Sequence, residues 1–435
     1  MRKTVSGTVL ILLLTSMLSS ALNIQLVKAE STTVSGDITT DTTWYFSESP
    51  YIVTGDVILF PGYTLAIEPG VTVLSYPNTR LIIRGILKAD GTESHRITFT
   101  CPNGRWYGIS IATELGGKAT IRFANFYNAS TAVYISLSNP GYPVVEIYDS
   151  VFANNSIGLG GYVGSGGTLV EKCTFENNTY GITQADYNVY NSVFKKNDYG
   201  LYATERVNVY YSTFVENQVA LYGGRGEVKY SQITNNGIGV QSFFEGFTLS
   251  NNIITNNDVG VILGQYDTYS APVEYNDIYN NVAYNLKNIG DANKFAKYNW
   301  WGTTDPYEIE IKIYDGYDDA SVGVVEYSPI LTGPQNTAPS AIEVDRAITT
   351  GPGGIFKDTT WTLSESPYII TEDLTLFPGY TLTIQPGVEV KFSPSTKLTI
   401  RGSLVAEGTE SKRIVFTSTE PGTKGSWDGI DVATH

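Results

Sequence analysis

Sulfur, imidazole and charged side chains are scarce in this chain of 435 residues. It has two cysteines, two methionines and two histidines, and Asp, Glu, Lys and Arg together make up only 16 % of it. Met1 and Met17 both lie near the N-terminus, which leaves too few Met, His and Cys ligands for a soft-metal site. His95 becomes a lysine in a second copy of its segment, and His435 is the last residue. We therefore expect no histidine general base.

The charge that is present is mostly negative, with a net value of −15 and a pI near 4.6. Such a chain is not expected to bind nucleic acid, and it repels polyanionic polysaccharides at long range. The one long apolar run follows Arg2 and Lys3, and "VKAE" then offers a small-residue cleavage site. This pattern predicts a signal peptide over 1–29, with an uncleaved membrane anchor as the alternative. We thus expect a secreted or cell-surface protein, built as a monomeric module.

One phrase recurs seven times at intervals of 19 to 24 residues. Its anchors are Phe152, Phe175, Phe194, Phe214, Ile233, Ile254 and Ile278. Three residues after each anchor stands an asparagine: Asn155, Asn178, Asn197, Asn217, Asn236, Asn257 and Asn281. A small polar residue, or Cys173, stands two before it, and a glycine usually stands six after it.

Each phrase divides into short apolar segments separated by Asn, Gly and Ser, which is typical of strands joined by bends. We therefore predict that each phrase forms one coil of an all-β parallel solenoid, with equivalent residues about 4.8 Å apart. Stacked asparagines then form a structural ladder through their amide donors and acceptors. The glycines are expected to supply positive φ at the bends. Cys101 and Cys173 are expected to be small buried side chains without a disulfide.

This repeat resembles the right-handed parallel β-helix repeats of the pectate-lyase-like superfamily, over roughly residues 35–331. The resemblance implies the fold. It leaves the function open, because the same fold is used by lyases, hydrolases, adhesins and stalks.

A larger duplication defines the domains. The segment 41–100 returns at 358–417 with 40 of 60 positions identical, including Trp44 as Trp361. We predict an N-terminal cap with the first coils over 31–120, repeat coils over 121–299 and a closing segment over 300–331. A linker over 332–357 and an incomplete second β-helix module over 358–435 follow. "NWWGTTDP" is similar to the ends of β-helix modules in secreted archaeal and bacterial surface proteins, so Trp300 and Trp301 are expected to plug the lumen. Because the second module stops where its repeats should begin, we expect either a truncated chain or a C-terminal cap.

The candidate catalytic residues lie in one outward-facing column. Eleven residues after the anchor, successive coils bring Asp186, Glu205 and Arg225 together, flanked by Arg206 and Glu227. Two carboxylates about 5 Å apart can bind Ca²⁺. With an arginine base they could carry out β-elimination on a uronic acid, or they could act as a glycosidase acid and nucleophile. The alternative is an exposed ladder of compensating charges.

Two further sets of residues are candidates for contact with glycans. Tyr190 and Tyr210 share one column and Tyr202 and Tyr222 another, so their rings could hold sugars or simply pack across strands. Sequons place Asn128, Asn154 and Asn177 as glycosylation candidates. From all this we predict a non-catalytic structural, adhesive or glycan-contacting module, with polysaccharide or cell-envelope glycan as its partner. No cofactor is expected beyond Ca²⁺. The alternative is an extracellular polysaccharide lyase or glycoside hydrolase acting through Asp186 and Glu205.

Overall fold

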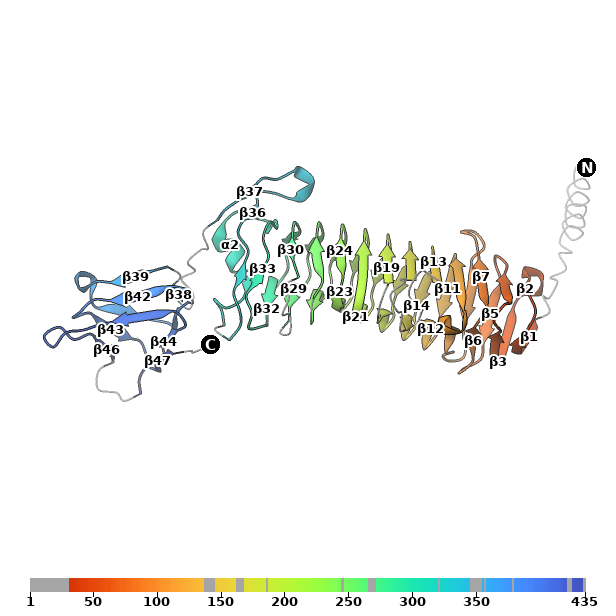
Figure 1. Ribbon diagram of the computed structural model, residues 1–435, viewed down its shortest axis with the longest axis horizontal. Helices are drawn as coiled ribbons and strands as arrows, with labels where there is room; N and C mark the ends of the chain where they lie inside the picture. The colour runs from red at the N-terminus through yellow and green to blue at the C-terminus, as the bar shows by residue number, and fades with distance from the viewer. Residues whose placement is uncertain are drawn as a thin grey trace, which may run out of the picture.

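The computed structural model describes residues 31–136, 145–161, 168–184, 187–243, 246–264, 271–319, 321–344, 354–355, 357–377, 379–420 and 425–432. The predicted signal peptide lies outside them. The described residues form parallel β-solenoids almost without helix, as the repeat predicts (Figure 1). No helix among these residues has the length and apolarity needed to cross a membrane.

The first module has three parallel sheets, and each coil adds one strand to each sheet. Two long strands at the N-terminal end, β1 (Thr32–Ile38) and β3 (Tyr51–Leu59), take part in both sheet II and sheet III. Sheet I contains β2 (Thr42–Trp44), β4 (Thr64–Ile67), β7 (Ile86–Asp90), β10 (Lys118–Arg122), β13 (Val145–Tyr148), β16 (Thr168–Glu171), β19 (Tyr187–Tyr190), the second half of β21 (Tyr199–Tyr210), β24 (Glu227–Lys229), β27 (Thr248–Ser250) and β30 (Val273–Glu274).

Sheet II continues with β5 (Thr72–Ser75), β8 (Ile97–Thr100), β11 (Ala124–Tyr127), β14 (Val151–Ala153), β17 (Thr174–Glu176), β20 (Val193–Lys195), β22 (Thr213–Val215), β25 (Gln232–Thr234), β28 (Ile253–Thr255) and β31 (Asp277–Tyr279). Sheet III continues with β6 (Arg80–Ile83), β9 (Gly108–Ile111), β12 (Thr131–Ile135), β15 (Ile157–Gly161), β18 (Tyr180–Thr183), the first half of β21, β23 (Val219–Arg225), β26 (Ile238–Ser242), β29 (Val259–Leu263), β32 (Tyr284–Asn288) and β34 (Ile313–Tyr314).

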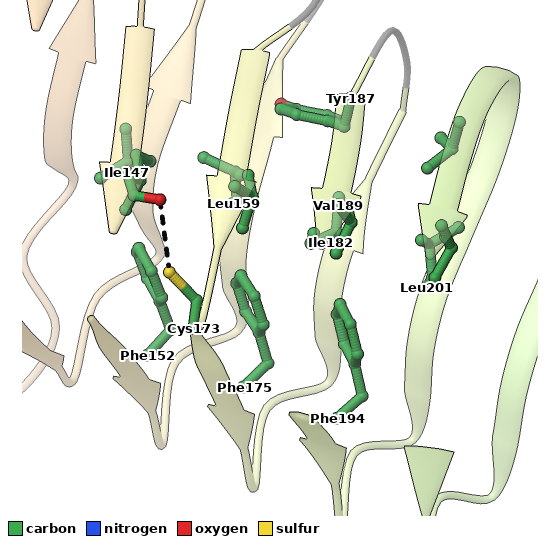
Figure 2. Packing of buried hydrophobic residues seen from close by; sticks show 14 of the residues in the cluster. Ile147, Phe152, Leu159, Cys173, Phe175, Ile182, Tyr187, Val189, Phe194 and Leu201 are labelled. Carbon is green, nitrogen blue, oxygen red and sulfur yellow. Dashed lines mark hydrogen bonds between the residues drawn. The ribbon is translucent and has the colours of Figure 1, made fainter. Parts of the chain in front are cut away.

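The anchor residues form a continuous column inside the solenoid. Phe152, Phe175 and Phe194 are fully buried and stack with ring centroids 4.8 Å apart, as the row in Figure 2 shows. Because the rings stack at the spacing of the coils, each ring both buries a large apolar area and adopts a favourable stacked geometry. In the same view the Cys173 thiol donates to the Ile147 carbonyl at 3.6 Å. Both cysteines are buried and free.

The asparagine ladder is present at all seven positions, each at most 3 % exposed. In each step the side-chain oxygen of one asparagine accepts the backbone N–H and the amide Nδ2 of the asparagine one coil earlier. Nδ2 also donates to the anchor carbonyl of the preceding coil, as Asn197 does to Phe175 at 3.0 Å. Each buried amide thus has hydrogen-bond partners in the low-dielectric interior, so the column avoids the cost of burying unsatisfied polar groups.

The small polar column forms a second ladder of the same kind. The backbone N–H of Ser192 donates to the Ser212 hydroxyl at 3.1 Å, and that of Ser231 donates to the Asn252 side chain at 3.0 Å. Cys173 joins it through its N–H, which donates to Ser192 Oγ. The column also holds Asn252 and Asn276, whose side-chain oxygens accept the backbone N–H of the preceding coil in the same way.

The glycine column does not have the role expected of it. Gly158, Gly181 and Gly200 do not adopt positive φ; instead a Cβ at Gly181 would lie 2.4 Å from the Gly200 carbonyl oxygen and 3.1 Å from the Phe194 ring. These glycines are needed for space. The positive φ falls at non-glycine corners: one corner column holds Asn128, Asn154, Asn177, Lys196, Glu216, Asn235, Asn256 and Asn280 at φ between 53° and 58°. The other holds Phe123, Asp149, Lys172, Asn191, Tyr211, Tyr230, Asn251, Tyr275 and Tyr298 at φ between 48° and 57°.

The closing segment differs in part from its prediction. Trp301 is 3 % exposed and joins the core, whereas Trp300 is half-buried and is held by a backbone bridge to Asp277. The segment includes α2 (Pro306–Glu310), whose first turn is capped by Asp305 accepting from the Tyr307 N–H. It also includes β35 (Val325–Glu326), which pairs with β33 (Lys294–Phe295) just before the segment. One tryptophan fills the lumen because adjacent residues of an extended chain point to opposite sides.

The predicted linker is shorter than 332–357. Residues up to 344 fold back on the first module, because β36 (Ile330–Leu331) pairs antiparallel with β37 (Ala341–Ile342) and the Gln335 N–H donates to Asp277 at 3.1 Å. The second module already begins at β38 (Gly354–Ile355), which pairs with β41 (Leu374–Leu376). The sequence did not reveal either boundary, since Pro- and Gly-rich composition does not distinguish a hairpin from a linker.

The second module repeats the first coils and has its own core. Its sheets are β38, β41, β44 (Lys397–Ile400) and β47 (Gly429–Val432); β39 (Thr359–Trp361), β42 (Thr381–Ile384) and β45 (Ser403–Ala406); and β40 (Tyr368–Ile370), β43 (Glu389–Phe392) and β46 (Val415–Ser418). Trp361 stacks on Tyr368 at 4.9 Å, as Trp44 stacks on Tyr51 at 4.8 Å. Similar sequence therefore gives the same local packing in both copies.

Candidate functional site

The predicted charged column borders a polar groove of about 620 Å³ on sheet I. The groove is lined by Arg206, Asn208, Tyr210, Arg225, Gly226, Glu227, Gly246, Thr248, Ala271 and Pro272. These residues come from β21, from the end of β23 and from β24, β27 and the segment before β30. Because side chains alternate along a strand, Asn208 and Tyr210 both point outward from β21 into the groove, while Val207 and Val209 fill the core.

The two arginines meet because of a bulge. Arg206 lies opposite Arg225 in the parallel register, and the register shifts between Ala203 and Arg206. The prediction that Glu205 shares a column with Arg225 is therefore wrong by one residue, because β21 has an extra residue here relative to β23. Glu205 is exposed. Asp186 lies outside the described residues, so its pairing with Glu205 stays a prediction.

A crowded glycine of β23 lies next to the bulge. Gly224 has φ +94°, and a Cβ there would lie 2.0 Å from Cζ of Phe247, whose side chain is 1 % exposed. The ring of Phe247 thus packs directly against the backbone at the end of β23. Arg225, the last residue of β23, directly follows this glycine.

Glu227 is held as an anion in the floor of the groove. Lys229 Nζ lies 2.8 Å from its Oε2, and the Tyr210 hydroxyl donates to the same oxygen at 3.0 Å. The hydrogen bond from Lys229, with a smaller contribution from Tyr210, lowers the pKa of Glu227. Burial and the Glu227 contact raise the pKa of Tyr210 to about 12.

These shifts limit what the groove can do chemically. At neutral pH Glu227 is ionised and Tyr210 is protonated, so Glu227 has no proton to donate and Tyr210 cannot accept one. The described lining contains no histidine or cysteine. Arg206 and Arg225 supply two fixed positive charges with planar donor arrays, which suit binding to ligand oxygens.

Both predicted tyrosine columns are present as stacks. Tyr190 and Tyr210 stack at 5.1 Å on sheet I, beside the groove, and Tyr202 and Tyr222 stack at 4.8 Å on sheet III. The second pair also makes edge-on contacts with a third column, because Tyr199 lies 5.6 Å from Tyr202 and 5.7 Å from Tyr222. All four predicted tyrosines are half-buried, which is consistent with cross-strand packing.

Sequence reasoning missed Asn208, Lys229 and Thr248 as groove residues or partners. Asn208 Nδ2 donates to Asn188 Oδ1 at 2.9 Å, and its oxygen accepts the Glu227 N–H at 3.3 Å. Its position two residues before Tyr210 is a signal that could have found it, since both must face outward. Lys229 could have been found as the residue opposite Tyr210 one coil later.

The sequons occupy one corner column, where the backbone takes positive φ. Asn154 and Asn177 are exposed, whereas the Asn128 amide donates to the Cys101 carbonyl at 3.2 Å and is half-buried. Within the described ranges, no group of three or more His, Cys, Asp or Glu side chains is arranged to hold a metal ion.

Comparison with known proteins gives partial likenesses. No family model matches the chain. Protein bark beetle of Drosophila melanogaster is 33 % identical over 157 residues, which are 34 % of this chain and 5 % of that protein, so this chain spans about a twentieth of its length. The structure of the PL6 family alginate lyase AlyGC aligns with 87 % of this chain and 72 % of its own, at a TM-score of 0.31 and 11 % identity. The likeness to the lyase is one of parallel β-solenoid architecture.

Proposed function

We propose that this is a secreted or cell-surface β-helix protein whose groove on sheet I binds a glycan without cleaving it. The observation that carries the proposal is the pairing of Arg206 with Arg225 beside Tyr210, in a groove where Glu227 is locked as an anion. The arginines would bind sugar oxygens, and the adjoining tyrosine stack would contact the sugar ring. The solenoid serves as a rigid support that fixes their spacing.

Binding is tested by affinity electrophoresis of the whole chain through gels that contain one polysaccharide each, with and without Ca²⁺. We expect retardation by at least one polysaccharide, and we expect the double variant R206A/R225A to lose it. The matched control is K88A/K118A, which removes two exposed positive charges from β7 and β10 on the same sheet, away from the groove. Equal loss in both double variants would show that only net charge matters and would contradict the proposal.

The alternative, a polysaccharide lyase or hydrolase, is tested on the same panel by measuring unsaturated and reducing ends. We expect no release above the buffer control. Release that disappears in Glu205→Ala or Asp186→Ala, with Arg206 and Arg225 intact, would establish catalysis and overturn the proposed function.

A further inference from the structure

A row of tyrosines runs along the corner that follows sheet I, outside the groove and outside every predicted column. Tyr211 and Tyr230 are 57 % and 49 % exposed, and their rings stack at 5.0 Å with planes 9° apart. Two coils further on, Tyr275 and Tyr298 stack at 5.3 Å with planes 7° apart, and Tyr275 is 44 % exposed. Asn251 occupies the same column between the two pairs.

The column is continuous in register. The first four members directly follow residues that stand opposite one another on successive strands: Tyr210, Lys229, Ser250 and Glu274. The fifth, Tyr298, accepts the Tyr275 N–H at its carbonyl oxygen at 3.0 Å. Tyr230, Asn251 and Tyr275 also share the left-handed backbone conformation, at φ 55°, 57° and 57°. The outer face of the Tyr230 ring and that of the Tyr275 ring therefore flank Asn251, two coil spacings apart, or about 10 Å.

The backbone does not account for aromatic residues at these positions. In the other left-handed corner column of the same solenoid, six of the eight residues are asparagine, which tolerates this conformation better than most other residues that carry a side chain. Here only Asn191 and Asn251 are asparagine, while tyrosine fills four positions where it is strained. Strain kept at an exposed site indicates a role beyond folding.

Stacking joins the tyrosines in two pairs, and the row is broken between the pairs at Asn251. A ring placed over Asn251 would lie about 5 Å from each neighbour, the separation at which these tyrosines already stack on one another. The gap is thus one ring thick, with an amide at its base that can both donate and accept hydrogen bonds.

We propose that the gap between Tyr230 and Tyr275 binds one pyranose ring of a neutral, β-linked glycan, with Asn251 bonding its hydroxyls. A pyranose with equatorial hydroxyls presents C–H groups on both faces, so it can contact two aromatic rings at once. The net charge of −15 favours a neutral polymer over a polyanion at long range. This site is separate from the groove, and it does not depend on Arg206 or Arg225.

The test is isothermal titration of the whole chain with cellohexaose. We expect binding that weakens at least tenfold in Tyr230→Ala and in Tyr275→Ala. Asn251→Tyr should abolish it, because the new ring fills the gap and completes the stack from Tyr211 to Tyr298. The melting temperature of this variant should stay the same or rise, so its loss of binding cannot be assigned to unfolding.

Asn191→Tyr is the matched control, because it adds a ring to the same column beyond Tyr211 and leaves the gap open. It should bind cellohexaose as the parent does. Absence of cellohexaose binding, or equal loss in Asn191→Tyr and Asn251→Tyr, overturns the inference. R206A/R225A separates the two sites: it should abolish retention in the groove assay while cellohexaose binding persists.

Discussion

Asn197 accepts two hydrogen bonds from Asn178 one coil earlier, from its backbone N–H and from its side-chain amide, both at 3.0 Å. Asn197 in turn donates to Asn217 and to the Phe175 carbonyl. One side chain thus connects its own coil to the coils on both sides of it. The ladder connects coils that share no adjacent sequence, which makes it the first place to test what holds the solenoid together.

Replacing Asn197 with alanine should destabilise the first module by about 3 kcal/mol, because buried donors of Asn178 and the Phe175 carbonyl lose their partner. Urea unfolding monitored by far-UV circular dichroism measures the change. Asn188→Ala is the control. Asn188 is half-buried on sheet I and accepts one hydrogen bond, from Asn208, so its loss should cost less than about 1 kcal/mol. Similar values for the two variants would contradict a special role for the interior ladder.

The phenylalanine column should tolerate a change of side-chain shape better than a loss of side-chain volume. Phe194→Ala should destabilise by about 4 kcal/mol, since it leaves a cavity between the rings of Phe175 and Phe214. Phe194→Ile should cost clearly less, because isoleucine fills the same column at Ile233 and Ile254 without exposure. Thermal unfolding of both variants compares the two effects. A destabilisation by Phe194→Ala well below this value would show that the coils collapse around the cavity.

Gly224→Ala should be strongly destabilising and should also impair binding in the groove. The added methyl meets the Phe247 ring, which must move and take the end of β23 with it. Gly36→Ala is a matched control, with φ +84° and no atom within 4 Å of the added Cβ. The two variants share the cost of positive φ, so the excess in Gly224→Ala measures the steric contact alone. Melting temperature and gel retardation give the readouts.

The Cys173 thiol should be inert in the folded protein. Burial raises its pKa to about 12, so almost no thiolate exists at pH 8, whereas an unfolded thiol ionises near about 8.5. Above about pH 8.5 the unfolded chain releases the thiol proton while the folded chain keeps it, so rising pH favours unfolding. The contribution of Cys173 to stability is therefore full below about pH 8.5 and is lost as the pH rises towards 12. Labelling with iodoacetamide at pH 8 should require urea. Rapid labelling of Cys173 without denaturant would disprove the buried assignment.

Cys173→Ser should be nearly silent by comparison. Serine fills the same column at Ser192 and Ser212, and there its hydroxyl donates to a carbonyl of its own coil. We expect a change in unfolding free energy below about 1 kcal/mol, and the same denaturation assay measures it. A large loss would mean that sulfur packing, rather than the small polar shape, stabilises this position.

The sequence by itself determined the coils and their columns. The anchor and the asparagine recur with the same period. Residues one period apart must stack when each coil adds one strand to each sheet. The stacking of Phe175 on Phe194 and of Asn178 on Asn197 could therefore be predicted. It also showed that the segment after Asp358 copies the cap. These are properties of a regular repeat, in which local spacing is enough to give spatial neighbours.

Only the tertiary structure decided the places where the repeat is interrupted. A bulge in β21 brings Arg206, and not Glu205, opposite Arg225, and no spacing rule contains such an extra residue. Glycine stands where the neighbouring coil leaves no room for a side chain, and asparagine takes the positive φ at the open corners. Which positions are crowded and which are open could be seen only in the structure. Such features are set by contacts between coils, and the bulge is what brought Arg206 and Arg225 together beside the groove.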